Sequence, residues 1–350
     1  MNRALQLGAG IVISVVCVLL SLVDVAPRDF LHPGVLAQAL HRIPQTIQAI
    51  VVALSHARWD GFAAVCVLTI FGFWVRAVRW RYFVQAGRPV PLSSLFSATM
   101  IGFMANNVLP FRLGEFVRPW ALGRREQLSK SMLLATIVVE RAIDMLTLLT
   151  IFGVALLLHP IAENTEAGHM VQQGARLMIA LSLGLTLFVI AAERNRKVAQ
   201  LVLAVVPAKL RARAAHLLDR FLDGFALFRD LGRLVQVFAL SLGMFLCYAA
   251  ALGITGASMH IALPWYSGLV MLVVTAIGIM VPAAPGYVGT LNIACVVGLA
   301  LFGIDQARAS AYSWFYFLSQ WLPITAVGLY YLHREGLSLK SLGEAHGEAA

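Results

Sequence analysis

Charged residues are scarce in this chain, and their scarcity excludes most soluble folds. Asp, Glu, Lys and Arg make up 13% of the 350 residues, whereas 60% are hydrophobic. A soluble domain is about a quarter charged. The apolar residues gather in runs of about 20, the length that crosses a bilayer as a helix. We therefore expect an all-α, polytopic membrane protein and no separate soluble enzyme domain.

Cysteine and catalytic sequence motifs are equally sparse. The four cysteines lie inside apolar segments and form no CxxC pair, so we interpret them as small hydrophobic residues in helix packing. No HExxH, Walker or GxSxG motif occurs, and the nine histidines are scattered. The sequence therefore predicts no catalytic site, no metal site and no cofactor.

An excess of basic residues gives the chain a formal net charge of +10. In a soluble protein this would suggest a nucleic-acid partner. Here the cations lie beside apolar runs, where membrane orientation and anionic lipid head groups explain them better. We expect a lipid partner and no nucleic acid.

The sequence predicts about eight transmembrane segments, with one or two re-entrant or broken helices. Residues 1–335 are expected to form a single transmembrane domain, with 336–350 as a short tail. The segment 193–233 has the pattern of a basic amphipathic helix, and Val35–Leu54 that of a surface helix. The apolar segments are Leu5–Val23, Gly61–Tyr82, Ser93–Leu109, Met132–Leu158, Leu177–Ala192, Leu234–Thr255, Trp265–Val281, Val288–Phe302 and Tyr312–Leu332.

Loop charges predict the orientation of these segments. The segment 193–233 carries nine Lys or Arg against four acidic residues, which predicts a cytoplasmic location, whereas 161–173 has acids and no Lys or Arg. Both termini are then cytoplasmic, in a bacterial inner membrane. Both ends of Ser93–Leu109 also face the cytoplasm, which predicts a re-entrant hairpin.

The pair Trp265–Val281 and Val288–Phe302 is either two spans or a second re-entrant hairpin that enters from the opposite face. Two oppositely oriented broken segments are typical of an inverted-repeat transporter. This interpretation rests on hydropathy, since no residue-level repeat accompanies it.

The densest polar cluster follows the first of these hairpins. It contains Asn107, Pro110, Arg112, Glu115 and Arg118. Proline breaks the helix, and irregular backbone at membrane depth survives only inside protein or beside water. The three charged residues recur every third position and can share one helical face. The cluster is either a site for a lipid head group or phosphate, or a cytoplasmic loop with solvated charges.

A second cluster lies in the middle of an apolar run. Glu140, Arg141 and Asp144 can meet on one helical face. Charges at the bilayer centre are expensive, so these groups must point into the protein. They are a structural ion-pair group, part of a polar pathway, or both.

Two further arginines, Arg76 and Arg79, end the span Gly61–Tyr82. Together with the other charged groups they make five cations against three acids, and this surplus suits a phosphate group held by arginine forks. The alternative is that Arg76 and Arg79 snorkel to the cytoplasmic interface.

A third, uncharged motif contains the five candidate residues Pro282, Pro285, Gly286, Gly289 and Asn292. Its glycines allow close backbone approach, and its freed amides can face a ligand. The alternative is a plain extracellular turn.

These motifs carry a resemblance. The run Asn107-Val-Leu-Pro-x-Arg-x-Gly-Glu-x-x-Arg118, then Leu134-Ala-Thr-x-x-x-Glu-Arg-x-x-Asp144, resembles the signature of the flippase-like family. That family is the transmembrane domain of lysylphosphatidylglycerol synthases and its stand-alone relatives. The motif Pro282-x-x-Pro-Gly-x-x-Gly289 resembles its second signature, although the usual acidic residue after it is here Asn292. The resemblance covers roughly Leu5 to Leu332.

The resemblance implies a lipid flippase that moves an anionic or glycosylated lipid between leaflets. Because the chain ends about 18 residues after the last span, we expect the aminoacyl-transferase activity of the synthases to be absent. Arg112 and Arg118, with Arg76 and Arg79, would hold the head-group phosphate, and the carboxylates would orient them or relay protons.

Two other functions stay open. One is a membrane-embedded enzyme that uses Glu115 or Glu140 as a base. The other is a non-transporting subunit that binds a lipid-modifying enzyme through residues 193–233.

Overall fold

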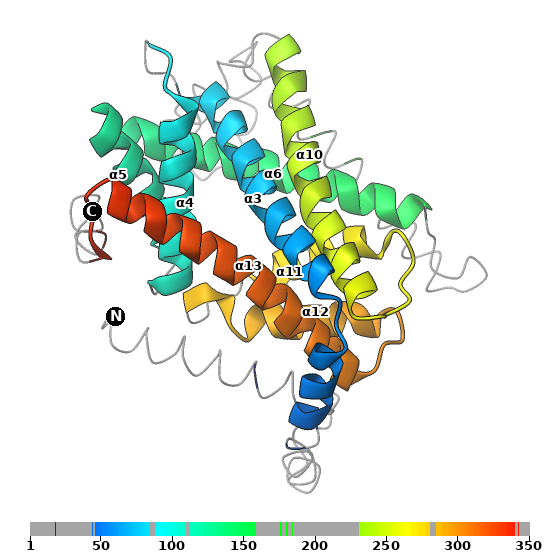
Figure 1. Ribbon diagram of the computed structural model, residues 1–350. Coiled ribbons are helices and arrows are strands. Elements are labelled where there is room, and N and C mark those ends of the chain that lie inside the picture. The colour runs from blue at the N-terminus through cyan, green and yellow to red at the C-terminus, as the bar shows by residue number, and fades with distance from the viewer. Residues whose placement is uncertain are drawn as a thin grey trace, which may run out of the picture. The chain divides into compact units, whose positions relative to one another are not determined.

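The computed structural model describes residues 46–84, 88–109, 113–158, 231–280 and 285–339, with a few isolated positions elsewhere. Within these ranges every regular element is a helix, in agreement with the predicted all-α class (Figure 1). The predicted spans Leu5–Val23 and Leu177–Ala192, and nearly all of the basic segment 193–233, lie outside the described residues.

Most of the described helices coincide with predicted apolar segments. A short helix, Thr46–Ser55, precedes them. The others are α3 (Trp59–Phe83), α4 (Leu92–Val108), α5 (Gly114–Glu126), α6 (Lys130–Leu158), α10 (Leu231–Ser258), α11 (Ser267–Gly278), the 3₁₀ turn η4 (Pro285–Tyr287), α12 (Thr290–Ala300) and α13 (Gln306–Arg334). Apart from α5, which matches no predicted apolar segment, α3, α6, α10 and α13 extend beyond their segments, whereas α11 and α12 are shorter.

Helix lengths fall into two classes. Two of the described helices, Trp59–Phe83 and Gly232–Ser258, are long and apolar enough to cross a membrane by length and composition. α6 and α13 have 29 residues each but carry more polar side chains. α4, α5, α11 and α12 have 17, 13, 12 and 11 residues, which is less than the roughly 20 that a bilayer core requires.

The chain divides into two compact units, and the division runs through α3, α4, α5 and α10. Unit 1 contains Met1–Phe71, Met100–Glu115 and Leu246–Leu342, and unit 2 contains Gly72–Thr99, Phe116–Phe245 and Gly343–Ala350. Each unit is described below by itself.

Close helix packing through small residues builds unit 1. α12 packs against both α11 and α13 (Figure 1). At several crossings a glycine lies so near the facing helix that an added Cβ would overlap it, as is common where helices pack in membranes. These contacts are Gly61 on Ser258, Gly268 on Ala249, Gly278 on Ala294, and Gly328 on Met104.

A proline inside α13 allows hydrogen bonds between α13 and α3 in unit 1. Pro323 lacks the N–H that would bond the carbonyl of Ser319 four residues earlier. That carbonyl accepts instead from Cys66 Sγ of α3 at 3.5 Å. Next to it, Gln320 Nε2 donates to Thr69 Oγ1 at 2.7 Å. The proline therefore lets α13 exchange a backbone hydrogen bond for contacts to α3.

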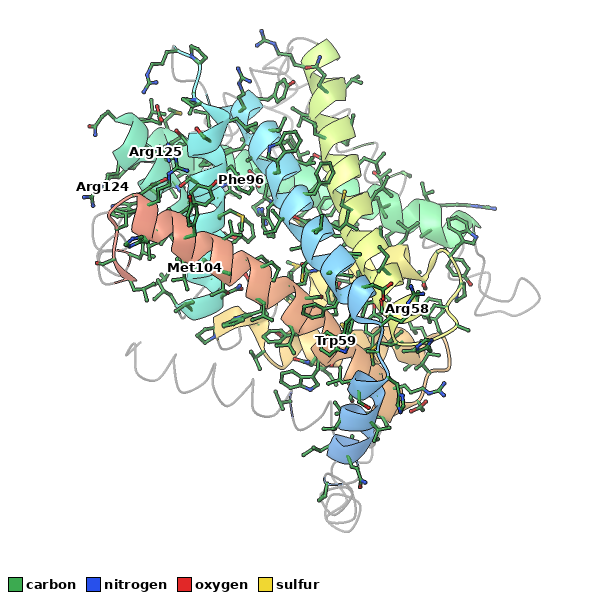
Figure 2. All side chains as sticks on the ribbon, in the orientation of Figure 1. Arg58, Trp59, Phe96, Met104, Arg124 and Arg125 are labelled. Carbon is green, nitrogen blue, oxygen red and sulfur yellow. The ribbon has the colours of Figure 1, made fainter. Side chains whose placement is uncertain are left out.

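In unit 2, most of α5 is an amphipathic helix, over residues for which the sequence predicted either a head-group site or a cytoplasmic loop. Residues 117–123 are all buried, among them Val117, Ala121 and Leu122. Arg124 and Arg125, labelled in Figure 2, are exposed in the last turn, where cations are favoured by the helix dipole. Packing of the apolar face stabilises this short helix, which would be marginal alone.

Candidate functional site

Six ionisable side chains meet in unit 2. α3 contributes two of them, α5 one and α6 three. Residues three or four apart lie on neighbouring turns of one helix face, so α3 and α6 can each present a pair. We term this group the arginine–carboxylate cluster; its members are Arg76, Arg79, Arg118, Glu140, Arg141 and Asp144.

Glu140 is the centre of the cluster. Its Oε1 accepts hydrogen bonds from Arg76 Nη1 at 2.7 Å and from Arg118 Nη1 at 3.0 Å, and Arg118 also reaches Oε2 at 3.0 Å. Arg141 Nη2 donates to the same Oε1 at 3.2 Å. Arg79 Nη2 lies 3.2 Å from this atom as an ion pair. Four guanidinium groups therefore converge on one buried carboxylate.

Asp144 holds a second set of contacts. Its Oδ1 accepts from Arg79 Nη1 at 2.6 Å, and Arg141 Nη2 lies 3.1 Å from Oδ2. Arg79 Nη1 also donates to Ser241 Oγ of α10 at 2.7 Å, and that hydroxyl donates in turn to the carbonyl of Val237. Three helices thus fix the position of the Arg79 guanidinium.

Arg118 is positioned by a tryptophan as well as by Glu140. Its Cζ lies 3.8 Å from the ring centroid of Trp80, which is a cation–π contact. The Trp80 indole N–H donates to Thr136 Oγ1 at 2.9 Å, and this hydroxyl donates to the carbonyl of Leu133. The stacked ring holds the plane of the guanidinium and so sets the direction of its remaining donors.

The cluster carries more positive charge than its own carboxylates neutralise. Four guanidinium charges face two carboxylate charges, which leaves two positive charges in surplus. Several buried donors also lack a hydrogen-bond partner among the described residues: Nε and Nη2 of Arg118, Nε of Arg79 and Nε of Arg141. Buried donors are normally satisfied, because leaving one unpaired costs about 1–3 kcal/mol. The cluster is therefore complementary to an anion with several acceptor oxygens.

Burial within the cluster is uneven. Arg76, Arg79 and Arg118 are 5%, 0% and 3% exposed, so snorkelling of Arg76 and Arg79 to the interface is excluded. The side chain of Arg141 is 41% exposed, unlike the others. Arg141 therefore forms the accessible edge of the cluster.

The residues of the first predicted motif, Asn107 to Arg118, do not all meet at one place among the described residues. Pro110 and Arg112 lie outside the described residues. Glu115 and Arg118 lie on neighbouring turns of α5, but Glu115 is exposed whereas Arg118 is buried. The continuously buried part of α5 begins at Val117, so Glu115 precedes it and Arg118 lies within it. Glu115 lies instead in the first turn, where a carboxylate is favoured by the helix dipole.

Other residues of the predicted motifs meet within unit 1. Asn107, near the end of α4, donates from Nδ2 to Thr325 Oγ1 of α13 at 3.0 Å and towards the Trp321 carbonyl at 3.5 Å. A Cβ on Gly286 of η4 would lie 3.3 Å from the Asn107 carbonyl and 3.0 Å from Trp321 Nε1. Two helix breaks that are distant in sequence therefore lie against α13 at one place, which we term the helix-break contact.

Neighbouring Asn106 joins α4 to α5. Its Oδ1 accepts a hydrogen bond from the backbone N–H of Gly114 at 2.8 Å, which satisfies one of the free donors at the start of α5. A Cβ on Gly114 would overlap both the Gly102 carbonyl and the Asn106 side chain. Only glycine therefore permits this approach.

The second predicted motif is a tight turn with close backbone approach, and not a plain loop. Pro282 lies outside the described residues, and Pro285 begins η4. Gly286 and Gly289 have φ of +75° and +87°, conformations that side chains other than glycine rarely adopt. Asn292 is buried; its Oδ1 accepts from the Gly289 N–H at 3.1 Å and its Nδ2 donates to Ser313 Oγ at 2.9 Å. Asn292 thus holds the turn and fixes α12 to α13.

A further contact in unit 2 ties the start of α4 to the end of α5. Ser94 Oγ donates to Glu126 Oε1 at 2.6 Å, and Arg88 Nη2 donates to Glu126 Oε2 at 2.9 Å. The Ser94 hydrogen bond, followed by that from Arg88, outweighs partial burial and lowers the pKa of the Glu126 carboxyl below its ordinary 4.5. Sequence reasoning did not identify this contact.

Sequence reasoning also missed three supporting residues: Trp80, Thr136 and Ser241. Thr136 and Ser241 each had a detectable signal. Thr136 precedes Glu140 by four residues and so shares its face. Ser241 is the only serine or threonine between Leu234 and Ile254. Among the described residues, no group of three or more His, Cys, Asp or Glu could hold a metal ion.

Comparison with known proteins gives one match. No curated protein and no solved structure matches the chain significantly. A family model described as the lysylphosphatidylglycerol synthase TM region matches residues 7–328, and this family is associated with modification or translocation of membrane lipids. The match confirms the resemblance drawn from the sequence motifs. The chain therefore belongs to the lysylphosphatidylglycerol synthase TM-region family and is an integral, multi-pass membrane protein.

Proposed function

We propose that the protein translocates a phosphate-bearing lipid between the leaflets of the bacterial inner membrane. The surplus positive charge of the arginine–carboxylate cluster is the observation that carries this proposal. A purely structural group of ion pairs is most stable when its charges balance, because each buried unpaired charge is expensive. A cluster with two extra cations and unused donors is better explained by an anion that binds there during the transport cycle.

Within this proposal the arginines have different roles. Arg118 presents the Nε–Nη2 edge of its guanidinium, the fork that binds two oxygens of a phosphate. Arg141 is the part-exposed group that meets the head group first. Glu140 and Asp144 hold the arginines in place while the site is empty.

Re-entrant hairpins are proposed to form the lipid path. The shortness of α4 and α5, and the Ser94–Glu126 hydrogen bond that joins their outer ends, support a hairpin that enters and leaves on one side. The pair α11 and α12 supports a second hairpin, since both helices are short and pack together. Two such hairpins entering from opposite faces would form an inverted-repeat arrangement.

The proposed topology has both termini in the cytoplasm, with residues 161–173 outside and 193–233 inside. Single cysteines at Glu166 and Lys209, in a chain otherwise free of cysteine, test this arrangement with a membrane-impermeant thiol reagent. Labelling of Glu166→Cys alone in intact cells is expected. Labelling of Lys209→Cys alone would reverse the orientation.

Transport is tested by reconstitution in proteoliposomes with tail-labelled phosphatidate and phosphatidylglycerol. Bleaching of the outer leaflet with dithionite measures how much labelled lipid crosses. Wild-type protein should raise crossing of at least one lipid, and Arg118→Ala should abolish the increase. Arg124→Ala is the matched control, because Arg124 is an exposed arginine of the same helix.

Two outcomes would overturn the proposal. If no phosphate-bearing lipid crosses faster than in empty liposomes, the protein is not a translocase for this class. If the lipid instead leaves the assay chemically changed, the protein acts as a membrane-embedded enzyme.

A further inference from the structure

The excess positive charge of the arginine–carboxylate cluster also indicates which class of phosphate it binds. Resting on the proposed function, we infer that the bound lipid carries a terminal phosphate monoester, a dianion, and not the monoanionic phosphodiester of most phospholipid head groups. Charge balance and the donor arrangement each support this inference.

Charge balance comes first. The described cluster holds four arginines and two carboxylates, and three of those arginines are at most 5% exposed. A phosphodiester has one negative charge and would leave one of the four guanidinium charges uncompensated. A phosphate monoester at neutral pH carries close to two charges. Only the dianion therefore neutralises all four guanidinium groups, the part-exposed Arg141 included.

The donors give a second, independent argument. Three arginines offer unpartnered nitrogen donors: Arg118 through Nε and Nη2, and Arg79 and Arg141 through Nε. The three guanidinium groups are neighbours, because each lies within 3.2 Å of Glu140 Oε1. A phosphate monoester has three non-bridging oxygens and a diester has two. One oxygen for each arginine is available only in the monoester.

A titration signature follows from this chemistry. The second ionisation of a phosphate monoester has a pKa of about 6, whereas a diester has no ionisation near neutral pH. Binding of the monoester should therefore weaken as the pH falls from 8 to about 5.5, because the dianion becomes a monoanion. Binding of a diester should stay nearly constant over the same range.

The experiment measures lipid binding to the full chain in an uncharged detergent by native mass spectrometry. The probes are phosphatidate, phosphatidylglycerol and diacylglycerol with identical acyl chains. Phosphatidate should bind at least about tenfold more tightly than phosphatidylglycerol, the effect expected from one further charge-assisted hydrogen bond. This preference should disappear near pH 5.5, and Arg118→Lys should reduce it because lysine keeps the charge but lacks the fork.

A substitution beside the cluster tests the charge argument directly. Ser241→Asp places a third carboxylate next to Arg79 and reduces the surplus to one positive charge. The preference for phosphatidate should then shrink towards equal binding, while the neutral Ser241→Asn should retain it. If Ser241→Asp does not fold, the wild-type comparison of the two lipids and its pH profile decide alone.

The outcomes separate this inference from the proposed function. Equal binding of phosphatidate and phosphatidylglycerol, both above diacylglycerol, overturns the monoester inference and leaves the phosphate site standing. Binding of all three probes alike overturns the phosphate site as well. A preference for phosphatidate that persists in Ser241→Asp with no change would show that charge surplus does not set the selectivity.

Discussion

The two units of this protein use buried polar groups in opposite ways. Among the described residues, every buried charged side chain lies in unit 2, whereas both buried asparagines, Asn106 and Asn292, lie in unit 1. The asparagines bond backbone amides or hydroxyls and shape the breaks between helices. The charges of unit 2 pair with one another and still leave donors unused.

Buried polar groups in a membrane protein can therefore either fix the backbone or remain available for a ligand. A polar group whose partners are all internal fixes the backbone, as at the helix-break contact of Asn107 and Gly286. A group with surplus charge needs something from outside to balance it. Four variants test this difference between the units, and each is expected to have a smaller effect than the one before it.

Glu140→Gln should have the largest effect. It removes the charge that four buried or half-buried arginines share, and loss of one partner of a buried ion pair typically costs ~3–5 kcal/mol. Thermal unfolding in detergent should show this loss in the free energy of unfolding. Glu115→Gln is the control, because Glu115 is exposed, and it should change stability little. Equal effects of the two changes would mean that the cluster is not a buried unit.

Gly114→Ala should come second and tests unit 1. The added methyl group would overlap the Gly102 carbonyl and the Asn106 side chain, and such overpacking costs about 1–3 kcal/mol. Gly253→Ala is the matched control, since nothing lies within 4 Å of a Cβ there. That control should be neutral or slightly stabilising in a thermal melt. A neutral Gly114→Ala would contradict the close approach of α4 and α5.

Arg141→Ala should destabilise the fold by about 1 kcal/mol or less, in the range of part-exposed ion pairs. On α6 itself Arg141 is the only cation beside the two carboxylates, so a larger loss would be expected if α6 stood alone. In the structure Glu140 and Asp144 keep Arg76 and Arg79 as partners. The free energy of binding phosphate-bearing lipid should fall by more than the free energy of unfolding does. A melting temperature that drops as far as that of Glu140→Gln would show that Arg141 is structural.

Glu126→Gln should have the smallest effect, and only at low pH. The pKa of Glu126 is lower in the folded protein than its ordinary 4.5, so ionised Glu126 stabilises the fold above that pH. Stability is lost as the pH falls through the folded-state pKa. The wild type should therefore lose part of its advantage over Glu126→Gln between about pH 5 and pH 3. Parallel pH profiles of the two melting temperatures would refute a folded-state role of this carboxylate.

Hydropathy alone predicted the membrane class, the helical class and the approximate bounds of the longer described helices. These follow from hydrophobicity over windows of about 20 residues, which is a local property. The sequence also predicted which neighbours pair on one helix, such as Arg141 with Asp144, because spacing of three or four residues defines a helix face. The motifs that carry the family resemblance are likewise local, and the family match confirms them.

Which helices share their polar groups became clear only from the packing of the helices in three dimensions. The amphipathic pattern of α5 was too short to be distinguished from a loop, and its packing placed Arg118 inside and left Glu115 outside. The sequence of α3 allows Arg76 and Arg79 either to snorkel to the interface or to point into the protein. They point into the protein because carboxylates on α6 pair with them there. The charge surplus of the cluster depends on contacts 22 to 68 residues apart in sequence. Local spacing cannot determine such contacts, because they depend on which helix faces pack together in three dimensions.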